Sequence, residues 1–243
     1  MVYDAKRVNN LIRCGWSVYR QFLDLIAPPR CVVCRKVGTW LCDVCAMTLP
    51  PLEAPICPRC GRLEKSGRLC PTCRTAPLDV APIRAVFLFE GAIRDVIHAL
   101  KYRGARHVLT PLTQRIAEVW KYHRMESDLL VPVPLYAGRE ARRGYNQSTL
   151  FARALAGSIG VPVAEGLLVR VRNTQSQTRL NREERQRNVK DAFAYTLYTR
   201  LDGERVTLID DVATTGATLQ ACAVVLLSNG VRSVNAFTLA RAS

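Results

Sequence analysis

The sequence predicts an α/β protein in which helices cover both faces of a mainly parallel sheet, with a small cysteine-rich module ahead of the sheet. Three observations lead to this prediction. From residue 84 onward, apolar segments of strand length alternate with segments of helical length, an order typical of parallel sheets. Eight of the ten cysteines lie between residues 31 and 73. The run 206–218 passes from a strand through two aspartates and a glycine turn into a helix.

The composition is that of a folded, basic protein. Apolar residues make up 49% of the 243 positions, which is enough for a packed core and excludes wholesale disorder. The formal net charge is +15, a balance that favours polyanionic partners such as nucleic acid or phosphorylated metabolites. A basic surface without a specific ligand would have the same composition, so charge alone does not choose between these partners.

The N-terminal residues 1–30 carry apolar side chains at helical spacing and end in Pro28-Pro29. Charged residues interrupt this stretch, so it lacks the compact apolar centre of a secretory signal and the length of a membrane span. We therefore expect an amphipathic helix that packs on the protein itself, no membrane insertion and a cytoplasmic location. The proline-containing stretch 76–82 marks the next boundary, which separates a cysteine-rich module (31–77) from an α/β domain (83–243).

Four Cys-x-x-Cys pairs occupy the cysteine-rich module. Two such pairs complete a tetrahedral four-cysteine zinc site, so we predict two structural zinc ions; disulfides would require an oxidising compartment. Seven residues separate the first pair from the second and nine separate the third from the fourth. Both gaps suit a hairpin and favour sequential pairing, while an interleaved arrangement stays open. The predicted ligands are Cys31, Cys34, Cys42 and Cys45 in one site and Cys57, Cys60, Cys70 and Cys73 in the other.

The α/β domain contains the predicted alternation of strands and helices. In a sheet of this kind, ligands bind beyond the carboxyl ends of the strands, so the loops that follow the strands are the candidate binding segments. The expected strands are 85–89, 129–133, 167–171, 192–195, 206–209 and 234–239, and the expected helices are 92–101, 109–124, 149–159, 182–188 and 217–227.

The loop that follows the strand 206–209 has the composition of a phosphate site. Backbone amides of residues 214–218 and the positive end of the next helix dipole can hold a phosphate, and threonine hydroxyls can add hydrogen bonds. Asp210 and Asp211 are acceptors at neutral pH, which suits ribose hydroxyls or the coordination shell of a metal. An ordinary strand–turn–helix corner with an aspartate cap is the alternative.

Two basic loops are predicted to reach the same edge of the sheet. In the first, Arg142 and Arg143 supply charge for a polyphosphate, while residues 146–148 either bind ligand or cap the next helix. The second spans residues 170–190 and holds seven basic and two acidic residues; it is interpreted as a lid over residues 175–179 with a helical arm, or as a charged helix alone. Lys101 ends the helix 92–101, where it complements the dipole and is also placed to reach a phosphate.

Residues 208–218 resemble, position by position, the phosphoribosyl-pyrophosphate (PRPP) loop of type I phosphoribosyltransferases. The resemblance implies a phosphoribosyltransferase-like sheet that binds PRPP with magnesium, the 5′-phosphate on the loop and the ribose hydroxyls on the two aspartates. The implied PRPP-binding residues are Asp210, Asp211, Ala213, Thr214, Thr215, Gly216, Ala217 and Thr218. Lys101, Arg142, Arg143 and Arg179 are the residues assigned to the pyrophosphate and the lid.

Nearly the whole chain resembles the ComF family, which includes the GntX proteins. The resemblance rests on the cysteine pairs and, in this order, on 101–104 (Lys-Tyr-Arg-Gly), 144–147 (Gly-Tyr-Asn-Gln), 175–179 (Gln-Ser-Gln-Thr-Arg) and the aspartate loop. Members join a zinc module to a type I phosphoribosyltransferase domain and are associated with bacterial competence, the uptake of transforming DNA.

This resemblance leaves three hypotheses open. One is a phosphoribosyltransferase whose acceptor and catalytic residues the sequence does not identify. The second is a DNA-handling protein that binds single-stranded DNA or a DNA-uptake or recombination protein. The third is a PRPP-sensing regulator that binds a protein partner through the zinc module.

Overall fold

The computed structural model of the chain describes residues 28–174, 182–196 and 201–243. A four-stranded sheet in the order β1-β6-β5-β2 lies at its centre, and every neighbouring pair is parallel. In the β5–β6 register, Ala213 lies beside Arg241, so the carboxyl ends of the two central strands meet at one edge. The strands of this sheet are β1 (Ile83–Leu88), β2 (Leu129–Pro132), β5 (Arg205–Ala213) and β6 (Ser233–Arg241).

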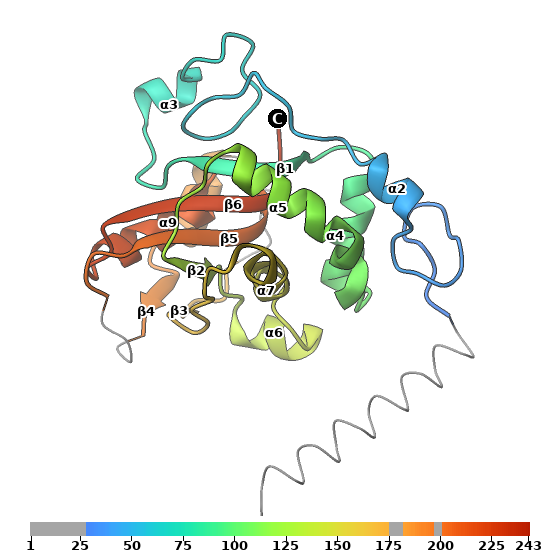
Figure 1. Cartoon of the computed structure of the whole chain (residues 1–243). Helices are drawn as coiled ribbons and strands as arrows, with labels where there is room; N and C mark the ends of the chain where they lie inside the picture. Colours follow the sequence, from blue (N-terminus) through green and yellow to red (C-terminus); the bar gives the residue numbers. More distant parts are fainter. Residues whose placement is uncertain (1–27, 175–181, 197–200) are drawn as a thin grey trace, which may run out of the picture.

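Helices cover both faces of the sheet, as predicted (Figure 1). Because successive strand residues point to opposite faces, Leu208 belongs to the core on one side and Ile209 to the core on the other. Phe237 of β6 stacks on Phe151 with ring centroids 5.9 Å apart and meets Trp120 edge-on at 5.3 Å. One face holds α4 (Ala92–Tyr102), η1 (Arg106–Leu112), α5 (Thr113–Tyr122) and α7 (Gln147–Ile159), and the other holds α9 (Ala217–Leu227).

Several elements differ from the sequence prediction. The expected helix 109–124 is split into the 3₁₀ helix η1 and α5, because Pro111 has no amide hydrogen to continue an α-helical ladder. A short helix, α6 (Ala137–Arg143), forms where a loop was expected. The strand 206–209 continues to Ala213, so both aspartates lie within the end of β5.

The prediction that the strands 167–171 and 192–195 extend the parallel sheet is wrong. They form a separate antiparallel pair, β3 (Leu168–Arg170) and β4 (Phe193–Tyr195). The predicted helical arm between them is present as α8 (Arg182–Val189). Short apolar runs indicate a strand but not its partner or direction, which explains the error.

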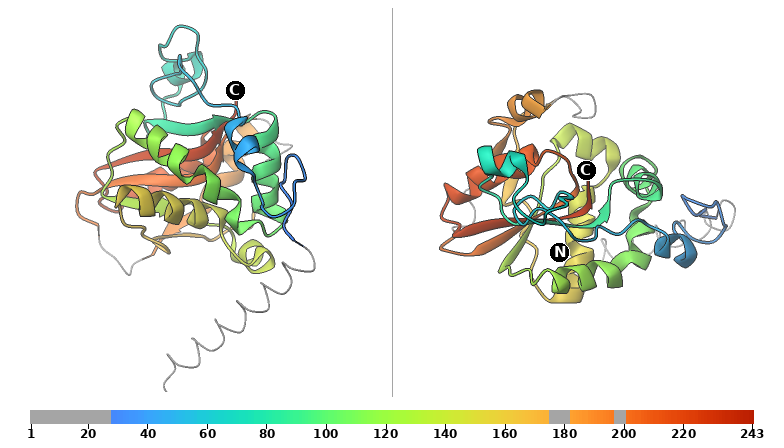
Figure 2. Two further views of the ribbon diagram at one scale, coloured as in Figure 1. Left: turned by 45° about the vertical axis from the view of Figure 1, so that its right-hand side comes forward. Right: turned by 90° about the horizontal axis from the view of Figure 1, so that it is seen from above.

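The cysteine-rich module divides into two ribbons that contact the α/β part at separate places (Figure 2). The first ribbon contains α2 (Asp43–Met47), and its buried cysteines join the core formed by α4, η1 and α7. The second contains α3 (Pro71–Thr75), and its four cysteines form a small cluster against Leu78. Within the described part of the chain, no helix combines the length and apolarity that crossing a bilayer requires. Residues 1–27 of the predicted N-terminal helix lie outside the described residues.

Candidate functional site

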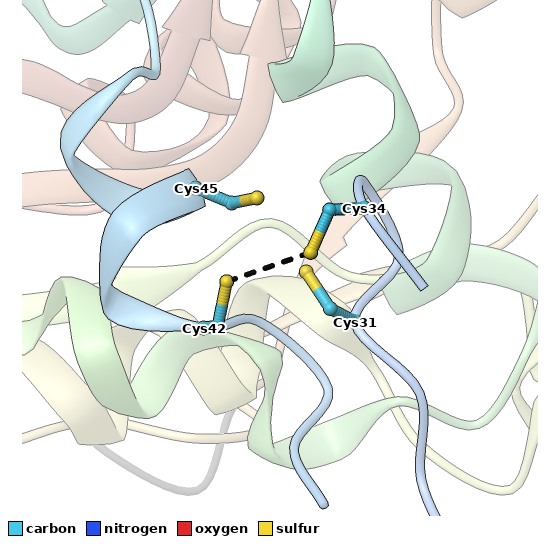
Figure 3. A group of neighbouring side chains, drawn as sticks. All are labelled: Cys31, Cys34, Cys42 and Cys45. Atoms are coloured by element: carbon cyan, nitrogen blue, oxygen red, sulfur yellow. Dashed lines mark hydrogen bonds between the residues drawn. The ribbon is translucent and has the colours of Figure 1, made fainter. Parts of the chain in front are cut away.

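The eight paired cysteines form two compact clusters, and Figure 3 shows the first of them. Cys34 and Cys42 have their sulfurs 3.7 Å apart, as do Cys60 and Cys70. All four ligand atoms of each cluster lie within 4.8 Å of one another. Tetrahedral zinc with Zn–S bonds of about 2.3 Å separates its sulfurs by about 3.8 Å, so both clusters fit a structural zinc ion. The sequential pairing is confirmed, and the interleaved alternative is wrong.

The two ribbons repeat one local fold. In each, the amide of the first cysteine donates to the carbonyl five residues later, at 2.8 Å for Cys31 and 2.7 Å for Cys57. The residue four positions after that cysteine has a φ of +67° in both ribbons, Arg35 in the first and Gly61 in the second. A Cβ on Gly61 would lie 2.4 Å from the carbonyl oxygen of Ile83. Glycine is therefore required where the second ribbon meets β1.

The predicted phosphate loop connects β5 to α9 at the carboxyl edge of the sheet. Gly216 caps the helix with a φ of +84°, and the amide of Ala217 donates to the Thr215 hydroxyl at 3.3 Å. The first amides of an α-helix have no partner within the helix and carry its positive dipole end. The structure therefore places residues 214–218 around a helix N-terminus, the geometry that anion binding requires.

The two aspartates at the end of β5 have different surroundings. Asp210 accepts hydrogen bonds at Oδ1 from the Ser148 hydroxyl at 3.0 Å and from the Asp211 amide at 2.9 Å. Asp211 is buried and its Oδ2 lies 2.8 Å from Nζ of Lys101. Burial and then the charge of Asp211 raise the pKa of Asp210 to about 7, against the opposing effect of Lys101. Burial lowers the pKa of Lys101, but the charge and hydrogen bond of Asp211, together with the charge of Asp210, raise it overall.

The raised pKa of Asp210 predicts an unusual dependence of stability on pH. An unfolded chain releases the Asp210 proton near pH 3.8, whereas the folded protein holds it to about pH 7. The folded state therefore binds more protons between these values, and its stability falls as the pH rises through this interval. We expect the thermal midpoint of the wild type to fall relative to that of Asp210→Asn between pH 5 and pH 7. Parallel midpoint curves for the two proteins would contradict this assignment.

The Lys101–Asp211 ion pair predicts a second measurable effect. Lys101→Met leaves a buried carboxylate without its partner, and breaking a buried pair costs about 3–5 kcal/mol. We expect the free energy of unfolding in urea to fall by about 3 kcal/mol, the lower end of this range, because a quarter of the Lys101 side chain (26%) is exposed. Asp211→Asn in the Lys101→Met background should restore most of this loss, as a double-mutant cycle measures. Additive losses would show that the two side chains do not interact.

The basic residues predicted for the pyrophosphate are only partly brought together. Arg143, at the end of α6, donates to the side-chain oxygen of Gln147 and lies over the Tyr102 ring at 5.5 Å. Arg142 is exposed, and Arg179, with the rest of the predicted lid at 175–179, lies outside the described residues. Asn146 caps α7, since its side chain accepts from the Ser148 amide at 3.0 Å. The capping alternative is therefore confirmed for Asn146.

Three residues at this edge have contacts that the sequence did not predict. Ser148 binds Asp210 directly, and a pair of half-buried arginines, Arg139 from α6 and Arg170 from β3, both donate to Thr174. The pKa of Arg170 is lowered by burial and by the charge of Arg139, with Asp210 acting in the opposite direction. Both arginines belong to the two basic segments that the sequence predicted to be loops, but the folding of α6 and β3 is what brings them together.

The chain has relatives along almost its whole length. Residues 22–74 match the family model of the double zinc ribbon domain. The chain is 30% identical over 227 residues to DNA utilization protein YhgH of Salmonella typhimurium, covering 89% of this chain and 99% of the relative. It is 28% identical over 224 residues to competence protein F of Haemophilus influenzae (88% and 97% covered). With competence protein ComFC of Bacillus subtilis it shares 30% identity over 220 residues (87% and 88%).

Solved structures similar to this chain include two phosphoribosyltransferases. A purine phosphoribosyltransferase from Pyrococcus horikoshii Ot3 aligns with a TM-score of 0.34 and 14% identity, over 55% of this chain and 72% of that chain. An adenine phosphoribosyltransferase from Thermoanaerobacter pseudethanolicus aligns with a TM-score of 0.35 and 17% identity, over 55% and 80%.

Proposed function

The chain belongs to the ComF family, and on this premise we propose that it binds PRPP with Mg²⁺ and acts in DNA uptake during natural transformation. The role in DNA uptake is supported by the names of its relatives, two competence proteins and a DNA utilization protein. The binding site is the carboxyl edge of the sheet, where β5 delivers two aspartates beside the first turn of α9.

The aspartate pair beside the helix N-terminus is the observation that carries this proposal. The 5′-phosphate binds the amides of residues 214–218, and the ribose hydroxyls donate to Asp210 and Asp211. Lys101 forms an ion pair with Asp211. Together with Arg142, Arg143 and Arg179, it binds the pyrophosphate. Mg²⁺ prefers carboxylate and phosphate oxygens, so we expect it to bind together with PRPP.

Binding of PRPP and its turnover are separate activities. In turnover, a nucleophile forms a bond to C1 of the ribose while the bond from C1 to pyrophosphate breaks. Release of pyrophosphate in the presence of candidate acceptors is the assay for this second activity. A regulator that only senses PRPP would bind the ligand and release none.

A thermal-shift experiment tests binding. A ligand that binds only the native state stabilises it by about 2.7 kcal/mol at a concentration of 100 times Kd. We expect Mg-PRPP to raise the thermal midpoint of the wild type, and not that of the Asp210→Asn/Asp211→Asn variant. Asp128→Asn is the control, because Asp128 binds Arg205 at the opposite end of β5 and should leave the rise intact. An equal rise in the double variant would remove both aspartates from the site.

Direct binding of single-stranded DNA is a second candidate function, and Tyr102 favours it. Its side chain is 66% exposed, lies beneath the Arg143 guanidinium and follows Lys101 in the chain. Single strands bind by stacking on exposed aromatic rings next to cations, at about 1–3 kcal/mol per base. We expect Tyr102→Ala to weaken binding of a single-stranded oligonucleotide by about 5- to 150-fold. Tyr122 is also exposed, and Tyr122→Ala should have no effect.

Salt provides the independent check on DNA binding. Phosphate contacts release counterions, so the affinity should fall steeply as the ionic strength rises. An oligonucleotide that fails to bind even at low salt would contradict direct binding. Equal losses in the two tyrosine variants would show that Tyr102 is not the stacking platform.

A further inference from the structure

A buried arginine joins the second ribbon to the phosphate loop. Arg241, the last residue of β6, is 1% exposed. Its Nε donates to the carbonyl oxygen of Cys60 at 2.8 Å, and its Nη1 donates to the carbonyl oxygens of Ala213 at 2.8 Å and of Thr214. One guanidinium therefore binds the backbone of a predicted zinc ligand on one side and the start of residues 214–218 on the other.

Arg241 has no carboxylate partner within the described part of the chain; it donates to four backbone carbonyls and also interacts with the Cys60 side chain. A buried cation is costly unless other groups compensate its charge. Four thiolates around Zn²⁺ carry a net charge of about −2, and the Cys57/Cys60/Cys70/Cys73 site adjoins this guanidinium through Cys60. The second site thus fits both the geometry and the charge of Arg241.

Two further contacts hold the phosphate loop against the segment that follows the second ribbon. A Cβ on Gly216 would lie 3.1 Å from Cδ1 of Leu78, the residue that packs on the cysteines of the second site. The side-chain oxygen of Gln220, in the first turns of α9, accepts from the Asp79 amide at 2.7 Å. The first ribbon packs instead on the core beside α4 and η1, so the link to the loop belongs to the second ribbon.

We propose that Arg241 is a positioning residue through which the assembled second cysteine site fixes the backbone of residues 214–218, while the first site has no such effect. The consequence for ligand affinity rests on the proposed PRPP binding. The consequence for the conformation of the loop does not rest on PRPP binding, because the contacts of Arg241 exist without ligand. Zinc, when bound, holds the turn at Cys60 rigid, and Arg241 connects this turn to the loop.

Hydrogen exchange of the zinc-loaded full-length chain tests the proposal without ligand. We expect Arg241→Met and Arg241→Lys to speed amide exchange at residues 214–218. Lysine keeps the charge, but its single ammonium group cannot replace the fork that spans Cys60 and Ala213. Arg84→Met is the matched control, because Arg84 binds the Pro58 carbonyl of the same ribbon rather than Leu78 or the loop. Zinc content and circular dichroism establish that each variant is folded.

The cysteines supply a second test that does not depend on Arg241 variants. Cys73→Ser should speed exchange at residues 214–218, whereas Cys34→Ser should leave it unchanged. In calorimetry with Mg-PRPP, Arg241→Met should bind about tenfold more weakly than the wild type, because binding must then order the loop.

Each outcome separates this inference from the proposed function. Unchanged exchange in folded Arg241→Met would overturn the inference. Equal effects of Arg84→Met and Arg241→Met, or equal effects of the two cysteine variants, would also overturn it. If the wild type binds no Mg-PRPP but Arg241→Met speeds exchange at residues 214–218, the link between the second cysteine site and the loop is supported and PRPP binding is contradicted. Wild-type binding that Arg241→Met leaves unaltered supports PRPP binding and overturns the effect on affinity.

Discussion

Removal of zinc by a chelator is expected to unfold the second ribbon and to lower the thermal midpoint of the whole chain. Apart from the four cysteines, only the partly buried Leu78 contributes to the apolar cluster of this ribbon, so almost no hydrophobic core remains without metal. Structural zinc contributes about 10 kcal/mol or more to the folding of small ribbons. A net loss of about 5 kcal/mol would lower the midpoint of a chain of this size by about 10–20 °C.

Elemental analysis and metal restoration control this experiment. The two clusters predict two zinc ions per chain, and the addition of Zn²⁺ after removal of the chelator should restore the original midpoint. One zinc ion per chain or none would contradict the two-site interpretation. A chelator that removes both ions without lowering the midpoint would show that the ribbons fold without metal.

The cysteine sites could be predicted almost completely from the sequence. Two thiolates at Cys-x-x-Cys spacing bind one metal ion from a single turn. Gaps of hairpin length favour pairing of consecutive motifs, so short segments contain the necessary information. The parallel sheet and α9 were predictable for the same reason, since apolar periodicity and the glycine turn at Gly216 are local signals.

Other parts of the fold depend on contacts between distant segments. The antiparallel pairing of β3 with β4 was not predictable, because apolar periodicity does not specify a strand's partner. The ion pair between Lys101 and Asp211 joins α4 to β5, whereas the sequence offered a helix-dipole role or a phosphate contact for the lysine and no partner in β5. Arg241 belongs to none of the sequence motifs, and only the register of β5 and β6 places it beside Ala213.

The aspartate pair carries the largest expected effect on ligand binding. Hydrogen bonds to charged groups contribute about 1.5–3 kcal/mol each, so above pH 7, where Asp210 is ionised, the loss of both carboxylates should weaken Mg-PRPP binding by about 10²-fold or more. Asparagine preserves the shape of each side chain and retains one acceptor, which limits disturbance of the Ser148 contact. Because Asp211→Asn also removes the partner of Lys101, circular dichroism must show that the variant is folded before its affinity is compared with that of the wild type.

Titration calorimetry of the zinc-loaded protein with Mg-PRPP tests the PRPP assignment most directly. We expect one ligand per chain, displacement of that ligand by excess ribose 5-phosphate, and loss of binding in Asp210→Asn/Asp211→Asn but not in Asp128→Asn. The displacement follows because the phosphate loop and the aspartates recognise the part of PRPP that ribose 5-phosphate retains. No binding to the wild type, or equal affinity in the double aspartate variant, would contradict a PRPP site at the carboxyl end of β5.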